Sequence, residues 1–335
     1  MKLALCYKSI SKCPSHVGLG NSCRNTMNVL KQNGMNAEVW PIIGGDDLQS
    51  ILKTPKGNGV THVAIAAPFI PSDWMQRLAQ EFQHITFAVI SHSNVGFLQA
   101  ESAAIRLMRA YCDLSVYEHN FHAAGNNSRL VEAFNDAYGR YVLYLPNMYD
   151  LKSTPKFKAA RHFSSPIRIG SFGALRVQKN FTSAAWAAIS IARNLRVDLE
   201  FYVHMGRTDN NGNVVENAIR ASLEKLDGVK LIEVPWQDAV TFRRTVARMN
   251  LLLQPSYTET FSMVTADAIA EGVPVVVTPA VEWVPKNWQA DSDNVSEITK
   301  VGLGLLRDPH SAECGYQALL EYNKMSLQVW SQFLK

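Results

Sequence analysis

The chain has 335 residues, of which 47% are apolar and 19% are charged, and its formal net charge is +4. This length exceeds the usual size of one domain, so two domains with separate apolar cores are expected. The mild positive charge allows an anionic ligand but falls short of the signature of a nucleic-acid-binding domain. No run of eighteen apolar residues occurs, so no transmembrane helix is expected.

The five cysteines are scattered along the chain and suit free thiols in a reducing compartment. Cys13, His16 and Cys23 lack a fourth ligand and the two-residue spacing of a zinc site, so no metal site is expected. The apolar N-terminal run is interrupted at Lys8 without a cleavage signal, which favours a first strand over a signal peptide. We therefore expect a cytoplasmic protein, or one in the host cytoplasm if a phage encodes it.

Strands and helices alternate through the first half of the chain. A strand at 3–7 is followed by a turn-rich loop at 13–21 that carries Gly18 and Gly20, and then by a helix at 22–32 that ends at Asn33-Gly34. The repeated strand–helix order predicts a parallel, doubly wound sheet. The other elements expected here are strands at 37–41, 60–66, 85–90, 114–117 and 141–145, and helices at 72–82 and 102–109.

The same pattern restarts after a polar, basic segment. We predict two Rossmann-like, doubly wound α/β domains facing a cleft. The predicted boundaries are a first domain at 1–152, a linker at 153–166, a second domain at 167–311, and a C-terminal helix at 312–335 that packs back on the first domain. In the second half we expect strands at 167–170, 199–203, 229–234, 251–253 and 273–277, and helices at 184–191 and from about 262.

The segment 255–277 is the most informative part of the chain. Glu259 lies in a loop after a buried strand, and Asp267 lies inside a short, otherwise apolar helix that Gly272 ends. The helix begins near Ser262, and its free N–H groups form a site suited to phosphate at the ligand-binding edge of the sheet. Ionised carboxylates accept hydrogen bonds from hydroxyls, so a diphosphate beside two polyols, a nucleotide sugar, is indicated. The alternative is that Glu259 caps a helix and Asp267 is an exposed helix residue.

Two further loops follow first strands. In the loop 170–180, Gly173 allows close backbone approach, and Arg176 and Lys179 offer cations for a diphosphate. The alternative is a basic surface loop. Gly18 and Gly20 form a weaker Gly-x-Gly signal, for which a plain turn is the favoured explanation when the signal is taken alone.

Histidines follow several predicted strands. His92 comes directly after the strand at 85–90, in a loop with serine and asparagine, and is expected to face the cleft, although a core or surface histidine is the alternative. His119 and His122 are weaker candidates, and His204 either lines the cleft or closes its strand.

These motifs, in this order, resemble the retaining enzymes of glycosyltransferase family 4, which have the GT-B fold. The family reads Pro-Ser, two residues, Glu, seven residues, Glu-Ala-Met, then Gly-x-Pro-Val, and upstream Gly-Arg-Leu, three residues, Lys-Asn/Gly. Two departures stand out: Asp267 replaces the second Glu, and Ala174 replaces the Arg. The residues in register are Pro255, Ser256, Glu259, Asp267, Ala268, Ile269, Gly272, Pro274 and Val275, and upstream Gly173, Ala174, Leu175, Lys179 and Asn180.

The resemblance implies roles for these residues. Glu259 and His92 would contact the donor sugar at the catalytic centre, Asp267 would hold the ribose, and Lys179 would bind the diphosphate. Arg176 is our candidate to take the role of the family's arginine, whose position Ala174 occupies here. The full set expected to bind the donor is Gly18, Gly20, Gly173, Arg176, Lys179, Thr260, Phe261, Ser262, Met263 and Asp267.

The resemblance also implies an activity. A retaining glycosyltransferase would move a hexose from a nucleotide-diphosphate sugar, with a UDP-sugar such as UDP-glucose as the first candidate, to a hydroxyl acceptor that the sequence does not identify. No metal or other cofactor is implied. Two alternatives stay open: transfer to a hydroxylated DNA base, with basic residues of the linker tracking phosphates, and non-catalytic binding of a nucleotide sugar. On this basis Glu259→Ala is expected to slow transfer without changing folding.

Overall fold

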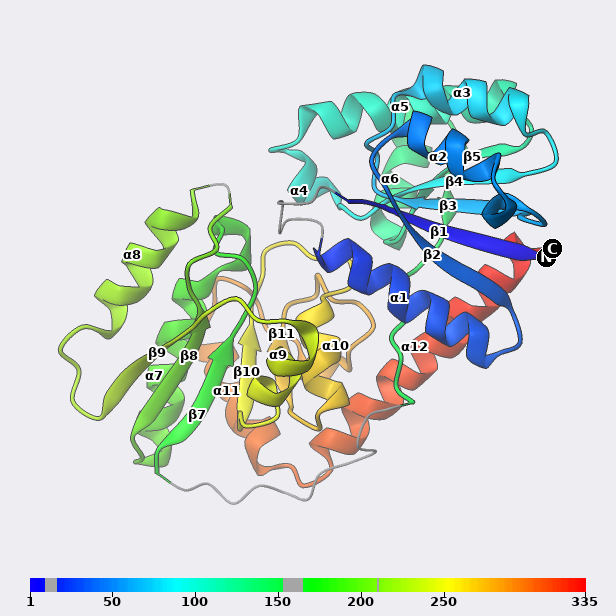
Figure 1. The fold of residues 1–335 in the computed structure, drawn as a ribbon. Helices are drawn as coiled ribbons and strands as arrows, with labels where there is room; N and C mark the ends of the chain where they lie inside the picture. Colours follow the sequence, from blue (N-terminus) through cyan, green and yellow to red (C-terminus); the bar gives the residue numbers. More distant parts are fainter. Residues whose placement is uncertain (10–16, 153–164, 210) are drawn as a thin grey trace. The chain divides into compact units, whose positions relative to one another are not determined.

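The computed structural model describes residues 1–9, 17–152, 165–209 and 211–335 (Figure 1). The chain forms two compact units, one of Met1–Asp150 with Tyr322–Lys335 and the other of Leu151–Glu321. Each unit contains one parallel sheet covered by helices, which confirms the predicted fold class of two α/β domains. Most of the predicted linker lies outside the described residues, and so do its basic residues Lys156, Lys158 and Arg161.

The first unit contains a six-stranded sheet in the order β2-β1-β3-β4-β5-β6, with every pair parallel. The chain moves from β1 to one side and then crosses to the other, so the order reverses between β1 and β3. Such a reversal creates a crevice at the carboxyl ends of the strands. The strands are β1 (Lys2–Lys8), β2 (Asn36–Ile42), β3 (His62–Ala66), β4 (Thr86–Ser91), β5 (Phe121–Gly125) and β6 (Leu143–Tyr144).

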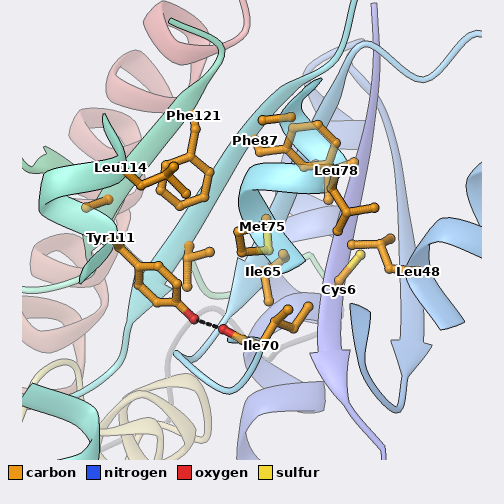
Figure 2. Packing of buried hydrophobic residues seen from close by; sticks show 14 of the residues in the cluster. Cys6, Leu48, Ile65, Ile70, Met75, Leu78, Phe87, Tyr111, Leu114 and Phe121 are labelled. Carbon is orange, nitrogen blue, oxygen red and sulfur yellow. Dashed lines mark hydrogen bonds between the residues drawn. The ribbon is translucent and has the colours of Figure 1, made fainter. Parts of the chain in front are cut away.

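Apolar layers cover both faces of this sheet. Figure 2 shows one layer, in which buried side chains of the sheet pack against helices and the Tyr111 hydroxyl donates to the Ile70 carbonyl. In the other layer the strands pack against α1 and against Trp330 and Leu334 near the end of the chain. The helices of this unit are α1 (Val17–Gln32), α2 (Gly45–Leu52), α3 (Ser72–Glu81), α4 (Val95–Leu98), α5 (Ser102–Tyr117) and α6 (Ser128–Tyr138).

Two predictions for this unit were wrong, and one strand was missed. Gly18 and Gly20 lie in the first turns of α1 and not in a loop. The residues predicted as a strand at 114–117 complete α5, because buried Met108, Tyr111 and Cys112 recur at helical spacing and continue the helix. The strand β5 was missed because its sequence, Phe-His-Ala-Ala-Gly, is poor in strand-forming residues, and its pairing with β4 and β6 outweighs that preference.

The second unit contains a five-stranded parallel sheet in the order β11-β10-β7-β8-β9. Here the order reverses between β7 and β10, because β8 and β9 follow on one side of β7 while β10 and β11 lie on the other. Gly170 in β7 permits close packing, since a Cβ at this position would lie 2.8 Å from the Leu252 side chain. The strands are β7 (Ile167–Ser171), β8 (Leu199–His204), β9 (Val229–Val234), β10 (Leu251–Gln254) and β11 (Val275–Val277).

The last helix contributes residues to both units. Its final part, from Tyr322, joins the first unit, where the Asn323 side chain bonds both backbone groups of Tyr149, at 3.0 and 2.7 Å. The Trp330 indole donates to the Pro146 carbonyl at 2.8 Å. No described helix has the length and apolar character needed to cross a membrane. The helices after β7 are α7 (Phe181–Leu195), α8 (Gly212–Leu223), α9 (Ala239–Val246), α10 (Met263–Ala270), α11 (Val295–Arg307) and α12 (Ser311–Phe333).

Candidate functional site

Two predicted site residues meet at the point where the strand order of the second sheet reverses. Lys179 ends a short 3₁₀ turn (Val177–Lys179) after β7, and Glu259 lies in the loop after β10. Their side chains form an ion pair and are only 10% and 9% exposed. The Ser256 hydroxyl also donates to Glu259, at 3.1 Å. A buried cation and a buried carboxylate are therefore joined where ligands bind in such sheets.

Hydrogen bonds to backbone groups fix the two loops that carry this ion pair. Asn180 has a left-handed backbone, with φ of 55°, and its amide donates to the carbonyls of Pro255 at 3.0 Å and Ser292 at 2.7 Å. The Tyr257 N–H donates to the Gln178 carbonyl at 3.0 Å. These bonds set the positions of both charged side chains before any ligand arrives, which is what electrostatic stabilisation of a reacting group requires.

The charge of Lys179 depends on its neighbours. Burial lowers the pKa of Lys179, the Glu259 carboxylate opposes that shift, and the Arg176 cation adds to it. Arg176 is thus close enough to Lys179 to act on its charge, as expected for two cations at one anion site. An ammonium group has three N–H donors, so Lys179 can hold Glu259 and still donate to a ligand.

Gly173 lies beside Lys179 and is held by a histidine. Its φ of 125° favours glycine, and a Cβ there would lie 3.6 Å from Cε of Lys179. The Gly173 N–H donates to Nδ1 of His204 at 3.2 Å. The His204 ring packs against Phe172, Trp236 and Phe242, and this burial lowers the pKa of His204 to about 4. The neutral ring accepts the Gly173 N–H, so His204 closes its strand and supports the glycine loop.

The loop before α10 brings the remaining donor candidates of this unit together. Ser262 has a φ of 62° and its hydroxyl lies 2.8 Å from that of Thr265. Phe261, which follows Thr260, stacks on Trp283 with ring centroids 5.3 Å apart, and the Trp283 indole donates to the Phe261 carbonyl at 2.7 Å. The loop thus enters the helix in one fixed conformation.

The helix α10 itself begins at Met263, and its first N–H groups have no carbonyl within the helix. Asp267 is half-buried one turn further along, on the face of Met263, among buried alanines and Ile269. This surrounding contradicts the alternative of a fully exposed Asp267.

Of the predicted site residues in the first unit, His92 follows a strand, whereas Gly18 and Gly20 lie in a helix. His92 directly follows β4, is partly buried, and lies with Nδ1 3.2 Å from the side-chain nitrogen of Asn126. Gly18 is exposed on α1, and Gly20 is explained by packing, since a Cβ there would lie 3.0 Å from the Tyr7 ring. The glycine-loop prediction therefore fails here, because the helix already begins at Val17.

Several residues with structural roles in the two units were not predicted. Asn180 and Ser256 were noted only as parts of a motif, and Asn126 was not noted at all. Of these, only Asn180 carried a signal, because asparagine is enriched in left-handed conformations before a helix. Within the described residues, no group of three or more His, Cys, Asp or Glu side chains is placed to hold a metal ion.

The ion pair changes what is expected of Glu259→Ala. Removing this carboxylate leaves the buried Lys179 cation without its charge partner, so we expect the free energy of unfolding to fall by about 3–5 kcal/mol. This revises the sequence-based expectation of unchanged folding. Urea unfolding followed by circular dichroism measures the loss. The double variant Lys179→Met/Glu259→Leu is the control. It should lose less stability than the single variants Lys179→Met and Glu259→Leu lose together. An unchanged stability of Glu259→Ala would contradict the buried pair.

Because His204 is buried, we expect the free energy of unfolding to depend on pH. Its pKa is about 4 in the folded protein and about 6.5 in an unfolded chain, so the unfolded state binds the proton first as the pH falls. The stability contributed by the neutral ring is complete above about pH 6.5 and is lost between about pH 6.5 and 4. Between pH 7 and 4.5, His204→Gln should therefore lose about 2 kcal/mol less than the wild type in urea unfolding. The exposed His119, changed to Gln, is the control, and equal losses in wild type and His204→Gln would refute the assignment.

Part of the chain resembles a known protein family. A family model described as Family 4 Glycosyltransferase in conflict systems matches residues 143–280, which include both loops of the ion pair. A comparison with curated protein sequences found no match.

Solved structures share the fold over most of the chain. The UDP-forming α,α-trehalose-phosphate synthase from Burkholderia xenovorans is 13% identical, with 87% of this chain and 75% of that chain covered and a TM-score of 0.62. Sucrose-phosphate synthase from Thermosynechococcus elongatus is 12% identical, with 99% and 98% covered and a TM-score of 0.67. Anabaena HepE in complex with UDP and glucose is 14% identical, with 98% and 99% covered and a TM-score of 0.61. The chain has the GT-B fold, and its residues 143–280 resemble the glycosyltransferases of family 4.

Proposed function

We propose that the protein transfers a hexose from a nucleotide-diphosphate sugar to a hydroxyl acceptor, with retention of the anomeric configuration. The observation that carries this proposal is the buried Lys179–Glu259 pair at the reversal point of the second sheet. A cation for the diphosphate and a carboxylate for sugar hydroxyls lie side by side there. A UDP-sugar is the first candidate donor, because the similar Anabaena protein was solved with UDP and glucose.

Breaking the sugar–phosphate bond leaves negative charge on the diphosphate, and three groups of this unit would stabilise it. Lys179 keeps N–H donors beyond the one that Glu259 engages. Arg176 adds a second cation near Lys179. The N–H groups at the start of α10 donate without needing a charged side chain. Because Lys179 is buried, its attraction for the phosphate is screened less than at the surface.

The carboxylates would orient the polyol parts of the donor. Glu259 accepts hydrogen bonds from sugar hydroxyls, and Asp267, on α10, accepts them from the ribose. As the bond from the sugar carbon to the phosphate oxygen breaks, the acceptor oxygen bonds to the same face of that carbon. The acceptor proton passes to the leaving phosphate oxygen, so no protein carboxylate acts as a nucleophile. No metal ion is part of this scheme.

Lys179→Ala tests the phosphate site. The lost charge-assisted hydrogen bond should weaken UDP binding by about 1.5–3 kcal/mol while uridine binding changes little. Isothermal titration with both ligands measures the difference. The exposed Lys225, changed to Ala, is the matched control in the same unit and should bind both as the wild type does. Equal losses for UDP and uridine in Lys179→Ala would show that the loop is only structural.

The donor and the stereochemistry are tested together. A thermal-shift panel of nucleotide diphosphates and their sugars should show the largest stabilisation with the true donor, because bound ligand stabilises the folded state. With that donor, NMR should show free sugar released without acceptor, and a product that keeps the donor configuration. A strong chelator should leave the rate unchanged. Inversion, or activity lost in chelator and restored by magnesium or manganese, would refute this mechanism.

A further inference from the structure

A pocket lies at the amino ends of the strands of the first sheet, at the edge opposite to the one that His92 follows. It is lined only by residues of the first unit and has a volume of about 780 Å³. Small-molecule sites typically have about 300–1,000 Å³. Its walls come from the starts of β3, β4 and β5, from the segment around β6 and from the end of α12. Because ligands of doubly wound sheets bind at the carboxyl ends of the strands, the proposed mechanism does not use this pocket.

The strand registers place a polar row on the floor of the pocket. His62 is paired with Thr86, and His122 is paired with Ala88, two residues after Thr86. Paired residues, and residues two apart on one strand, lie on the same face of a sheet, so His62, Thr86 and His122 share one face. Further along the strands this face carries buried alanines that pack with the end of α12. The polar row therefore takes the place of an apolar layer at the wall of a pocket.

The two histidines of this row differ in their hydrogen bonds. Nδ1 of His62 lies 2.9 Å from the Thr61 hydroxyl, and the ring is also hydrogen-bonded to the backbone of Phe333. His122 is half-buried and packs edge-on against Phe333, with ring centroids 6.5 Å apart. Its ring has no hydrogen-bond partner among the described residues. Burial lowers the pKa of both histidines, so both rings are neutral near pH 7. His122 thus offers one donor and one acceptor nitrogen to a ligand.

Aromatic rings and neutral polar groups complete the pocket. Phe333 and Tyr144 are half-buried, and Tyr141 lines the pocket although it is 76% exposed, so it lies at the rim. Among the described lining residues none has a carboxylate side chain, and the ammonium group of Lys335 is exposed. A charged ligand would lose hydration at this neutral floor without meeting an opposite charge. A ligand with hydroxyls and an apolar ring face fits better, because hydroxyls both donate and accept and the apolar face leaves water.

We propose that this pocket is a carbohydrate-binding site that takes one neutral sugar residue of a glycan. Tyr141 stacks on the C–H face of the sugar ring, and His122 hydrogen-bonds its hydroxyls. The sugar held here does not react, but it raises the local concentration of the rest of its glycan around the protein. The inference does not rest on the proposed function, since it concerns another edge of the sheet and a ligand without a nucleotide.

Binding can be measured in the full-length protein without any nucleotide. The probes are the methyl glycosides of glucose, galactose, mannose and N-acetylglucosamine at millimolar concentrations. The protein is labelled with ¹⁵N-histidine, and His122→Phe identifies the His122 signals. We expect at least one glycoside to shift these signals in a saturable way. Unchanged His122 signals with all four glycosides would overturn the inference.

Two variants test the contacts. Tyr141→Ala should weaken binding of the active glycoside about three- to tenfold, as expected for the loss of one aromatic contact. His122→Phe keeps a ring but removes both nitrogens, and should cause a similar loss. The exposed Tyr117 on α5, changed to Ala, is the matched control in the same unit and should bind as the wild type does. If His122→Phe does not fold, Tyr141→Ala decides, because its side chain is exposed. Equal affinities of Tyr141→Ala and the wild type would refute the site.

Two further ligands test the ligand class and separate this site from the proposed donor site. Glucose 6-phosphate should bind no more tightly than the neutral glycoside, and a preference for this anion would overturn the neutral ligand class. UDP should bind to Tyr141→Ala as it does to the wild type, since the proposed nucleotide site lies in the other unit. A matching loss of UDP affinity in Tyr141→Ala would refute a separate site. If the wild type binds a glycoside at His122 but no UDP, the proposed function fails while this inference stands.

Discussion

The buried ion pair between Lys179 and Glu259 is the interaction on which the second unit's ligand-binding edge depends. Taking either charge out of water is unfavourable by several kcal/mol, so each is stable only because the other is there. The pair also joins loops that lie 80 residues apart in the sequence. Glu259 thus has two roles that compete: it holds Lys179 in the free protein, and it is proposed to hold sugar hydroxyls in the complex. A ligand that brings its own negative charge to Lys179 can take over part of the first role.

Neutral side chains hold the loops around this ion pair in place. Asn180 fixes the two loops, and His204 holds the glycine loop through one neutral nitrogen. The first unit repeats this principle, since Asn126 bonds one ring nitrogen of His92. In both units a histidine depends on burial to stay neutral. Burial lowers the pKa of both rings, and the Arg207 cation adds to the effect of burial at His204.

The sequence allowed the loops of the second unit to be predicted well because their motifs restrict the backbone. The segment after β10 needs a turn, a short helix and a stop at Gly272, whose φ of 68° confirms the reason for that glycine. The strand β9 has the predicted bounds. In the first unit, by contrast, glycines at 18 and 20 suggested a loop, although both lie inside α1, where Gly20 packs on Tyr7 and Gly18 is exposed. The contact between His92 and Asn126 could not be predicted, because it depends on β4 lying beside β5, and β5 itself was missed.

The last helix has a consequence for how the protein is made. The first unit is not continuous in sequence, since it needs Tyr322–Lys335 in addition to Met1–Asp150. During synthesis, strands such as β1 leave the ribosome long before Trp330 and Leu334, which cover one face of their sheet. The part of that face which Trp330 and Leu334 cover stays exposed while the second unit is translated. The first unit thus completes its core only after the second unit has been translated, and in this interval it is open to aggregation or to binding by chaperones.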